Sequence, residues 1–107
     1  MREPDQEPRF GLTKNTLAKI NGVFAAYPQV ERVILYGSRA KGNYRASSDI
    51  DLVVVGANVT LPELLQIEQK LDDLLLPYKI DLSLMHRIDD AAVLDHIRRV
   101  GVDIFRR

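Results

Sequence analysis

The chain has 107 residues, which suits one small domain with a single core and leaves no room for a second. Its 15 Lys and Arg residues balance 15 Asp and Glu residues, so it lacks the basic excess usual in proteins that bind long nucleic acids. Cysteine is absent, which excludes disulfides and thiolate metal sites, and no apolar run approaches the ~18 residues of a membrane span. We therefore expect a cytoplasmic protein without membrane association or direct nucleic-acid binding.

The first nine residues, MREPDQEPR, are mostly charged and contain two prolines. They lack the apolar core of a signal peptide. We predict a flexible leader over residues 1–9, followed by a single domain over residues 10–107.

The first half of this domain predicts a helix followed by two strands. Thr13 can cap the helix, and Pro28 ends it. Residues 30–37 and 49–55 are short apolar runs rich in β-branched residues, which is typical of strands. Residues 38–48 between them are polar and contain glycine, so we expect a loop with room for one helical turn. The apolar face of the helix comprises Leu17, Ile20, Phe24 and Tyr27.

The second half predicts helix, strand, helix and a short last strand. Thr60 and Glu63 form a capping box, and Pro77 ends the helix that they open. Residues 78–85 form a strand, Asp89 or Asp90 caps the last helix, and residues 102–105 form the last strand. The order indicates a mixed α/β (α+β) protein, with a small mixed β-sheet packed against helices. The predicted buried residues are Leu64, Ile67, Leu71, Leu74 and Leu75 on the first helix, and Val93, Leu94, Ile97 and Val100 on the second, which Arg98, Arg99 and Gly101 terminate.

Asp49 and Asp51 are the first candidate functional residues. On a strand, residues two apart point to the same face, so the two carboxylates lie together while Ile50 and Leu52 point into a core. Paired carboxylates repel unless a positive charge lies between them, and their hard oxygens suit Mg²⁺. A lone Asp-x-Asp pattern is also compatible with a solvated strand face.

Asp81 lies in another short apolar strand, where aspartate is rare. If its strand neighbours that of Asp49, three carboxylates converge on one patch. Such a set is typical of sites that hold one or two Mg²⁺ ions for phosphoryl or nucleotidyl transfer. The alternative is a charge that protects an edge strand from aggregation.

The third candidate is the Gly37-Ser38 dipeptide at the end of the first strand. Glycine lets the backbone approach a ligand closely, and a hydroxyl with free N–H groups can bind phosphate oxygens. Arg39, Lys41 and Arg45 in the same loop can neutralise phosphate charge. By itself the dipeptide is equally compatible with an ordinary polar turn.

The order of these features carries a resemblance. Gly37-Ser38, a loop of ten residues and then Asp49-Ile50-Asp51 resemble the signature of the DNA polymerase beta-type nucleotidyltransferase superfamily. With its short length and late aspartate, the chain resembles the minimal nucleotidyltransferases (MNT), in particular the antitoxins of MNT–HEPN toxin–antitoxin pairs. The resemblance spans residues from about 10 to the C-terminus.

The resemblance implies a nucleotidyltransferase (polymerase beta-like) fold with ATP as the substrate. Ser38 and the Gly37 backbone would hold the β- and γ-phosphates, and Arg39 and Lys41 would make further phosphate contacts. The acceptor hydroxyl would attack the α-phosphorus in line, and pyrophosphate would leave. Positioning and charge neutralisation would supply most of the rate enhancement.

The aspartates would be both metal ligands and catalytic residues. By resemblance, Asp49 and Asp51 would bind Mg²⁺ that bridges the triphosphate. Asp81 would join a second Mg²⁺ and help to deprotonate the acceptor hydroxyl. Two Mg²⁺ ions are therefore the expected cofactors.

The acceptor follows from the family as well. Larger relatives hold it with an added domain, so here we expect a partner to hold it or to be it. In the resembled family this partner is an all-helical HEPN ribonuclease toxin, which the antitoxin binds and silences by transferring AMP to a tyrosine. We expect a hetero-oligomer with such a toxin. The alternatives are a non-catalytic antitoxin that occludes the toxin, and a nucleotidyltransferase for a small-molecule acceptor.

The two histidines, His86 and His96, are not spaced as a metal site. We expect surface or capping roles for both. Tyr36 and Tyr44 flank the Gly-Ser loop, where each can either contact a base or pack.

Overall fold

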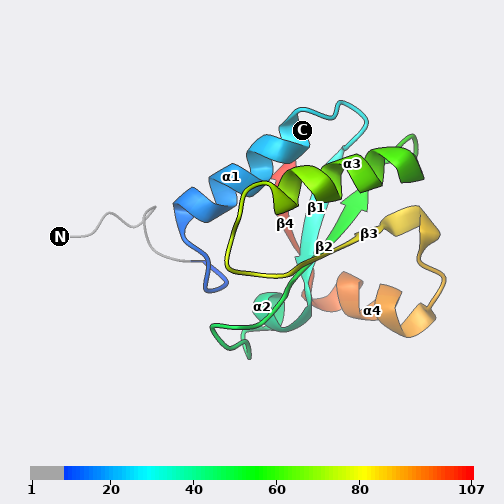
Figure 1. Ribbon diagram of the computed structural model, residues 1–107. Helices are drawn as coiled ribbons and strands as arrows, with labels where there is room; N and C mark the ends of the chain where they lie inside the picture. Colours follow the sequence, from blue (N-terminus) through cyan, green and yellow to red (C-terminus); the bar gives the residue numbers. More distant parts are fainter. Residues whose placement is uncertain (1–8) are drawn as a thin grey trace.

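The computed structural model describes residues 9–107 (Figure 1). Residues 1–8 of the predicted leader lie outside this range. Arg9, the last residue of that predicted segment, pairs with Leu12 through two backbone hydrogen bonds, Arg9 N to Leu12 O at 2.9 Å and the reverse at 2.8 Å. Leu12 itself is buried in the core, so the folded chain includes the turn before the first helix.

Seven of the nine elements in residues 9–107 are helices or strands of the predicted kinds, and the predicted fold class is confirmed. The loop after the first strand contains a short helix, α2, where the sequence left room for one turn. A 3-10 helix, η2, follows the third strand. In chain order the elements are α1 Lys14–Ala25, β1 Arg32–Tyr36, α2 Gly37–Lys41, β2 Ile50–Val55, α3 Leu61–Asp72, β3 Ile80–Leu84, η2 Met85–Arg87, α4 Ala91–Val100 and β4 Val102–Arg106.

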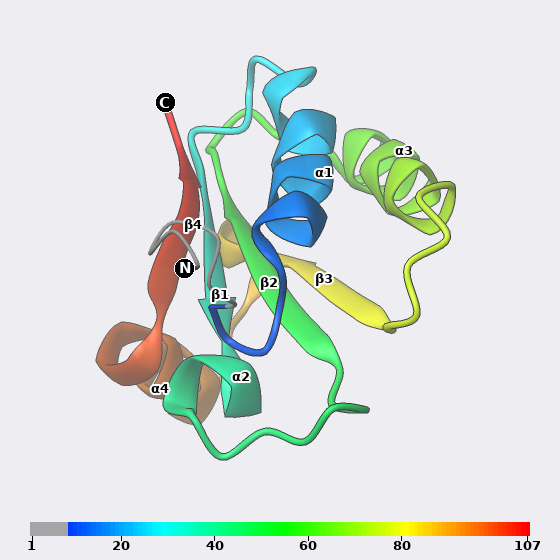
Figure 2. The same ribbon diagram turned by 90° about the vertical axis from the view of Figure 1, so that its left-hand side faces the viewer.

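The four strands form one mixed sheet in the order β3-β2-β1-β4. Strand β1 is antiparallel to both of its neighbours, β2 and β4, whereas β2 and β3 run parallel. A parallel connection needs a crossover, and α3 supplies it. Helices α1 and α3 lie side by side on one face of the sheet, and α4 covers part of the other face (Figures 1 and 2).

Side chains along each strand alternate between the two faces of the sheet, so the core has two unequal parts, one on each face. The larger part lies under α1 and α3, where Leu35 of β1 and Leu52 of β2 are fully buried. The smaller part, built around Ile34, Val53 and Ile97, lies under α4. Because neighbouring residues of a strand face opposite sides, the side chains of Asp51 and Asp81 belong to the α4 side of the sheet.

The predicted helix caps are confirmed. Thr13 caps α1, and Thr60 and Glu63 form the complete capping box of α3. Of the two candidates for the last helix, Asp90 is the cap, and its carboxylate accepts the N–H groups of Ala92 and Val93. The Arg107 guanidinium, at the other end of the chain, donates to backbone carbonyls at and after the C-terminal end of α1. Its acceptors are the carbonyl oxygens of Phe24, Ala25, Tyr27 and Val30.

Two helix ends differ from the prediction. Helix α3 ends at Asp72, before Pro77, and the predicted core residue Leu75 is 88% exposed. Leu75 adopts the left-handed conformation at φ 54°, which turns the chain out of the helix and its side chain into solvent. At the end of α4, Gly101 is extended (φ −63°) rather than left-handed. A Cβ at Gly101 would collide with the Ile97 carbonyl oxygen and with Ile34, so close packing explains this glycine.

The last helix is also less buried than predicted. Only Ile97 of its four predicted core residues is fully buried. Val93, Leu94 and Val100 are half-buried, because α4 covers only part of its face of the sheet.

The conformation of Leu75 gives a stability prediction. A left-handed backbone conformation costs a branched residue about 1–2 kcal/mol. Glycine avoids this cost, but it makes the unfolded chain more flexible, which cancels part of the gain in stability. We expect Leu75→Gly to raise the free energy of unfolding by about 0.5–1 kcal/mol, because the exposed side chain contributes no packing. Urea denaturation followed by circular dichroism measures the change.

The control is Leu65→Gly, because Leu65 is also exposed but lies within α3. There glycine should lower the free energy of unfolding by about 1 kcal/mol. The same sign for both variants would contradict the conformational explanation.

Candidate active site

The centre of the site is a row of three side chains across three strands. Asp51 of β2 is the register partner of Tyr36 on β1 and of Asp81 on β3. The three residues therefore lie next to one another on the α4 side of the sheet. Asp49 belongs to the same side but precedes β2, which begins at Ile50 rather than at the predicted residue 49, and it is exposed. The predicted proximity of the strands of Asp49 and Asp81 is thus observed.

Asp51 is costly to ionise in this position. Burial raises the pKa of Asp51 above its ordinary value, and the negative charges of Asp81 and then Asp49 raise it further, while nearby His96 opposes them. None of the three aspartates forms an ion pair with another residue of the described part of the chain. The site therefore has an excess of negative charge that a bound cation would relieve.

Tyr36 shares this environment. Burial raises the pKa of its hydroxyl, a side-chain hydrogen bond with Ser83 opposes that change, and the charges of Asp51 and Asp81 raise the pKa again. Ser83 lies two residues beyond Asp81 on β3, so it faces the same side of the sheet. Tyr36 thus connects β1 with β3 across β2 and stays protonated beside the carboxylates.

The Gly37-Ser38 turn lies directly beside Asp51. Gly37 has φ 75°, and a Cβ at this position would collide with the Asp51 carboxylate. Glycine is therefore required both by the backbone conformation and by the space. The Gly37 N–H donates to Nε2 of His96 at 3.1 Å. Ser38 is half-buried next to this turn, and Lys41 is exposed at the end of α2.

Arg39 is the predicted phosphate contact that the structure places elsewhere. Its side chain is 1% exposed, and its guanidinium donates to three backbone carbonyl oxygens. Nη1 donates to Phe10 at 2.9 Å, Nη2 to Ala46 at 3.1 Å, and Nε and Nη2 both to Ser48, at 3.1 and 2.9 Å. With its donors used in this way, Arg39 does not face a phosphate, and we correct its expected role to a structural one.

Two aromatic rings complete the surroundings of this arginine. The Arg39 guanidinium carbon lies 5.3 Å from the ring centre of Tyr44 and 4.8 Å from that of Tyr78. Tyr44, for which base contact and packing were alternatives, lies against Arg39 and remains 36% exposed. Because Ser48 immediately precedes Asp49, Arg39 fixes the loop that delivers the first aspartate to the site.

The burial of Arg39 gives the second prediction. Arg39→Met keeps most of the volume but leaves the three carbonyl groups without their donor, at about 1–3 kcal/mol for each buried group that water does not reach. We expect the free energy of unfolding to fall by about 2–4 kcal/mol in total. Thermal and urea denaturation measure the loss.

Lys41→Met in the same short helix is the matched control. Lys41 is exposed, so the free energy of unfolding of the Lys41→Met variant should stay within about 0.5 kcal/mol of the value for the original protein. An equally small effect of Arg39→Met would refute the structural role of Arg39.

The carboxylates do not form a complete metal cage by themselves. In residues 9–107, no three Asp, Glu, His or Cys side chains are arranged to hold a metal ion. The donor set nevertheless fits Mg²⁺, which proteins usually bind through one or two carboxylates together with substrate phosphates and water. Asp51 and Asp81 provide such a pair, with Asp49 next to it.

The charge of Asp51 gives the third prediction. Because its pKa is raised, the folded protein holds this proton more tightly than the unfolded chain, so stability falls as pH rises from the ordinary value of 3.8 through the raised pKa. At neutral pH, Asp51→Asn removes one of the negative charges that repel one another. We expect it to raise the free energy of unfolding by about 0.2–1 kcal/mol, the range for a cross-strand pair. The gain should shrink at acid pH.

Denaturation curves at several pH values test this expectation, with Asp95→Asn as the control. Asp95 pairs with Arg98 and Arg99, so its replacement should lower stability slightly or leave it unchanged. Destabilisation by Asp51→Asn at neutral pH would contradict the repulsion described above.

His96 is the site residue that sequence analysis missed, since a surface or capping role was expected for it. A signal was present, because Val93, His96, Ile97 and Val100 share the spacing of one helix face. The other histidine, His86, is exposed, and its Nε2 lies 3.2 Å from the Val59 carbonyl oxygen.

Comparison with known proteins identifies the family. The family model described as "Polymerase beta, Nucleotidyltransferase" matches residues 18–107. The chain therefore belongs to the polymerase beta nucleotidyltransferase family, as the Gly-Ser and Asp-x-Asp signature indicated. Among curated proteins, no match was found.

Solved structures share the fold. A toxin–antitoxin crystal structure with AMP-PNP matches with a TM-score of 0.66 and 21% identity, over 87% of this chain and 73% of that one. A Shewanella oneidensis structure, described as tri-AMPylated HEPN toxin in complex with MNT antitoxin, matches with a TM-score of 0.65 and 19% identity, over 88% and 72%. The toxin–antitoxin MntA-HepT matches with a TM-score of 0.66 and 18% identity, over 89% and 74%. Within residues 9–107 no helix has the length and apolarity needed to cross a membrane.

Proposed function

We propose that this nucleotidyltransferase moves AMP from Mg²⁺-bound ATP to a hydroxyl group. The acceptor is a tyrosine of a helical HEPN toxin, and the chain acts as its antitoxin. One observation carries the proposal, namely that Asp51 is paired with Asp81 on a neighbouring strand and packed against the Gly37-Ser38 turn. In a member of this family, that arrangement provides a cation site beside a phosphate site.

The turn supplies the nucleotide-binding part. Ser38 binds the β- and γ-phosphates through its hydroxyl and N–H, and Gly37, which has no side chain, lets the turn lie against Asp51. Lys41, exposed on α2, neutralises phosphate charge from the solvent side. Arg39 contributes indirectly, by holding the loop between this turn and Asp49.

The carboxylates supply the metal-binding and catalytic part. Asp49, Asp51 and Asp81 would hold Mg²⁺, with two ions when ATP is bound, and phosphate oxygens complete the coordination. When bound, Mg²⁺ withdraws charge from the triphosphate and lowers the barrier to attack at phosphorus. Tyr36 remains protonated, so it adds no negative charge to the three carboxylates.

The transfer itself is a single displacement. The acceptor hydroxyl oxygen forms a bond to the α-phosphorus, the bond from that phosphorus to the bridging oxygen breaks, and pyrophosphate leaves. The hydroxyl proton passes to Asp81, which is exposed on the α4 side of the sheet. Alignment and charge neutralisation provide most of the acceleration.

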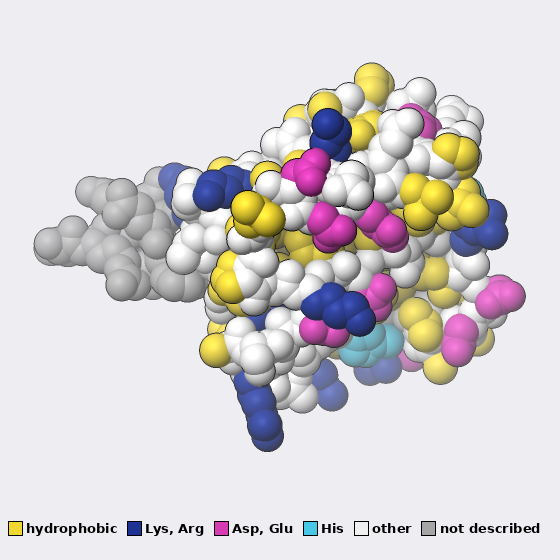
Figure 3. Space-filling model, in the orientation of Figure 1, with side chains coloured by type: hydrophobic (Ala, Val, Ile, Leu, Met, Phe, Trp, Pro, Cys, Tyr) yellow, Lys and Arg dark blue, Asp and Glu magenta, His cyan; other side chains and the backbone are white. Residues whose placement is uncertain are grey.

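The comparisons support the acceptor. The Shewanella oneidensis structure is described as an AMPylated HEPN toxin with its MNT antitoxin, and another toxin–antitoxin structure contains AMP-PNP. On the face shown in Figure 3, Asp and Glu side chains alternate with Lys and Arg side chains, which does not favour a long nucleic acid as the substrate. We expect the complex in the cytoplasm, where ATP and Mg²⁺ are available.

Intact-mass spectrometry tests the function directly. We would incubate the helical protein encoded beside this chain with the chain, ATP and Mg²⁺. The expected result is a gain of one or more AMP units on that protein, with loss of the gain when Mg²⁺ is chelated. The control is Asp49→Asn/Asp51→Asn, for which we expect transfer to fall by at least 10²-fold, the scale of losing transition-state charge stabilisation.

The other outcomes separate the alternatives. A stable complex with bound nucleotide but no mass gain would indicate an antitoxin that acts by occlusion. Absence of a complex, with AMP transfer to a small hydroxyl or amine compound, would indicate a small-molecule nucleotidyltransferase.

A further inference from the structure

His96 makes a contact that the proposed mechanism has not used. Its Nε2 lies 3.1 Å from the Gly37 nitrogen, across 59 residues of sequence, and the amide N–H points to it. An amide N–H can only donate, so Nε2 is the ring nitrogen without a proton, and Nδ1 carries the proton of a neutral imidazole. The contact joins the middle of α4 to the first residue of the Gly-Ser turn.

The surroundings hold the imidazole in place. Its ring meets the Tyr36 ring edge to face, with centres 6.2 Å apart and an angle of 76° between the planes. Ile97, the next residue, is 4% exposed and anchors α4 to the sheet. One imidazole thus contacts both the Gly37 amide and the Tyr36 ring.

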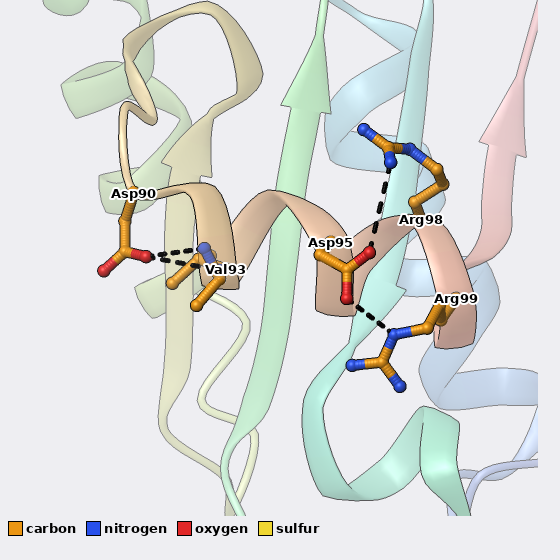
Figure 4. A network of polar contacts seen from close by, with 6 residues as sticks. Asp90, Val93, Asp95, Arg98 and Arg99 are labelled. Carbon is orange, nitrogen blue, oxygen red and sulfur yellow. Dashed lines mark hydrogen bonds and ion pairs between the residues drawn. The ribbon is translucent and has the colours of Figure 1, made fainter.

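Helix α4 has polar contacts of its own, which Figure 4 shows. The Asp90 carboxylate caps its first turn, at 2.9 Å from the Ala92 nitrogen and 3.2 Å from the Val93 nitrogen. Asp95 forms ion pairs with Arg98 and Arg99 in the last two turns, at 4.0 and 2.8 Å. The cap stabilises the helix itself, the exposed ion pairs add little, and the buried Ile97 side chain holds the helix to the sheet beside His96.

The Gly-Ser turn needs such support. Gly37 has a left-handed backbone, and α2 behind it is only five residues long. A helix of this length has little stability of its own. The Tyr36 cap residue makes no side-chain hydrogen bond to α2, so the Gly37 amide bond to His96 is a contact from outside that fixes the start of α2.

We propose that His96 is a positioning residue of the active site, which holds the Gly37 amide from α4 and thereby fixes the Gly-Ser turn against Asp51 in the orientation that receives phosphate. The inference rests on the proposed nucleotide binding at this turn. His96 does not touch the reacting atoms. Its contribution is to keep the turn in one conformation before the nucleotide arrives, which lowers the entropic cost of binding.

The experiment compares three variants by two measurements. His96→Phe keeps an aromatic ring against Tyr36 but has no acceptor, whereas His96→Gln keeps an acceptor atom. His86→Phe is the matched control, because His86 lies outside the site. For each, NMR gives the hydrogen-exchange rate of the Gly37 amide, and calorimetry gives the Kd for AMP-PNP with Mg²⁺.

For His96→Phe we expect the Gly37 amide to exchange about tenfold faster and the Kd for AMP-PNP to rise about tenfold, the scale of one lost hydrogen bond. For His96→Gln both values should stay within about threefold of the original protein, and for His86→Phe they should not change. Rescue by glutamine separates the acceptor role from mere packing. Should His96→Phe fail to fold, His96→Leu tests the same loss of the acceptor.

Two negative outcomes are distinguishable. Unchanged Gly37 exchange and AMP-PNP affinity in His96→Phe, with binding by the original protein, would overturn the positioning role alone. Failure of the original protein to bind AMP-PNP with Mg²⁺ would overturn the proposed nucleotide function, and the positioning role with it.

Discussion

The parallel pairing of β2 with β3 is the constraint on which the rest of the molecule depends. It places Asp51 directly beside Asp81, two like charges that the chain would keep apart if solvation alone decided. The pairing persists because Leu52, Leu82 and Leu84 on the same two strands face the large core under α1 and α3. Apolar burial on one side of the sheet thus holds together a charged arrangement on the other side.

The crossover through α3 follows from the same constraint. Parallel neighbours cannot be joined by a tight turn, so the chain must leave the sheet after β2 and return. The capping box at Thr60 starts that helix, and its buried residues close the core over the strands. The candidate site on the α4 side of the sheet therefore depends on a helix that packs on the opposite side.

Local patterns predicted most of the fold. The caps at Thr13 and Thr60 were found because side-chain oxygens before an apolar period are a strong signal. The carboxylate site was also accessible, since strand periodicity fixes which face Asp51 shares with Asp81 once their strands are neighbours. For the caps, and for the face of the strand on which each aspartate lies, the deciding residues are within a few positions of one another.

The predictions were wrong where the position of a residue depends on groups far away in the sequence. Arg39 has the sequence context of a phosphate contact, but its side chain is buried. It donates to the carbonyls of residues 10, 46 and 48 and lies against two tyrosine rings. Leu75 continues an apolar period, yet the helix has already ended and the backbone turns left-handed. His96 is unremarkable in sequence because its partner, the Gly37 amide, is a backbone group 59 residues away.

The Arg39 contact with Phe10 has a consequence for where this domain begins. The family match starts at residue 18, inside α1, as though the preceding turn were dispensable. Yet the Phe10 carbonyl accepts from the same guanidinium that holds the loop before Asp49, and Leu12 is part of the core. A boundary drawn from the shared pattern would cut through a contact that orders the catalytic loop. In this protein the segment before the first helix supports the candidate active site, although no residue in it carries the family signature.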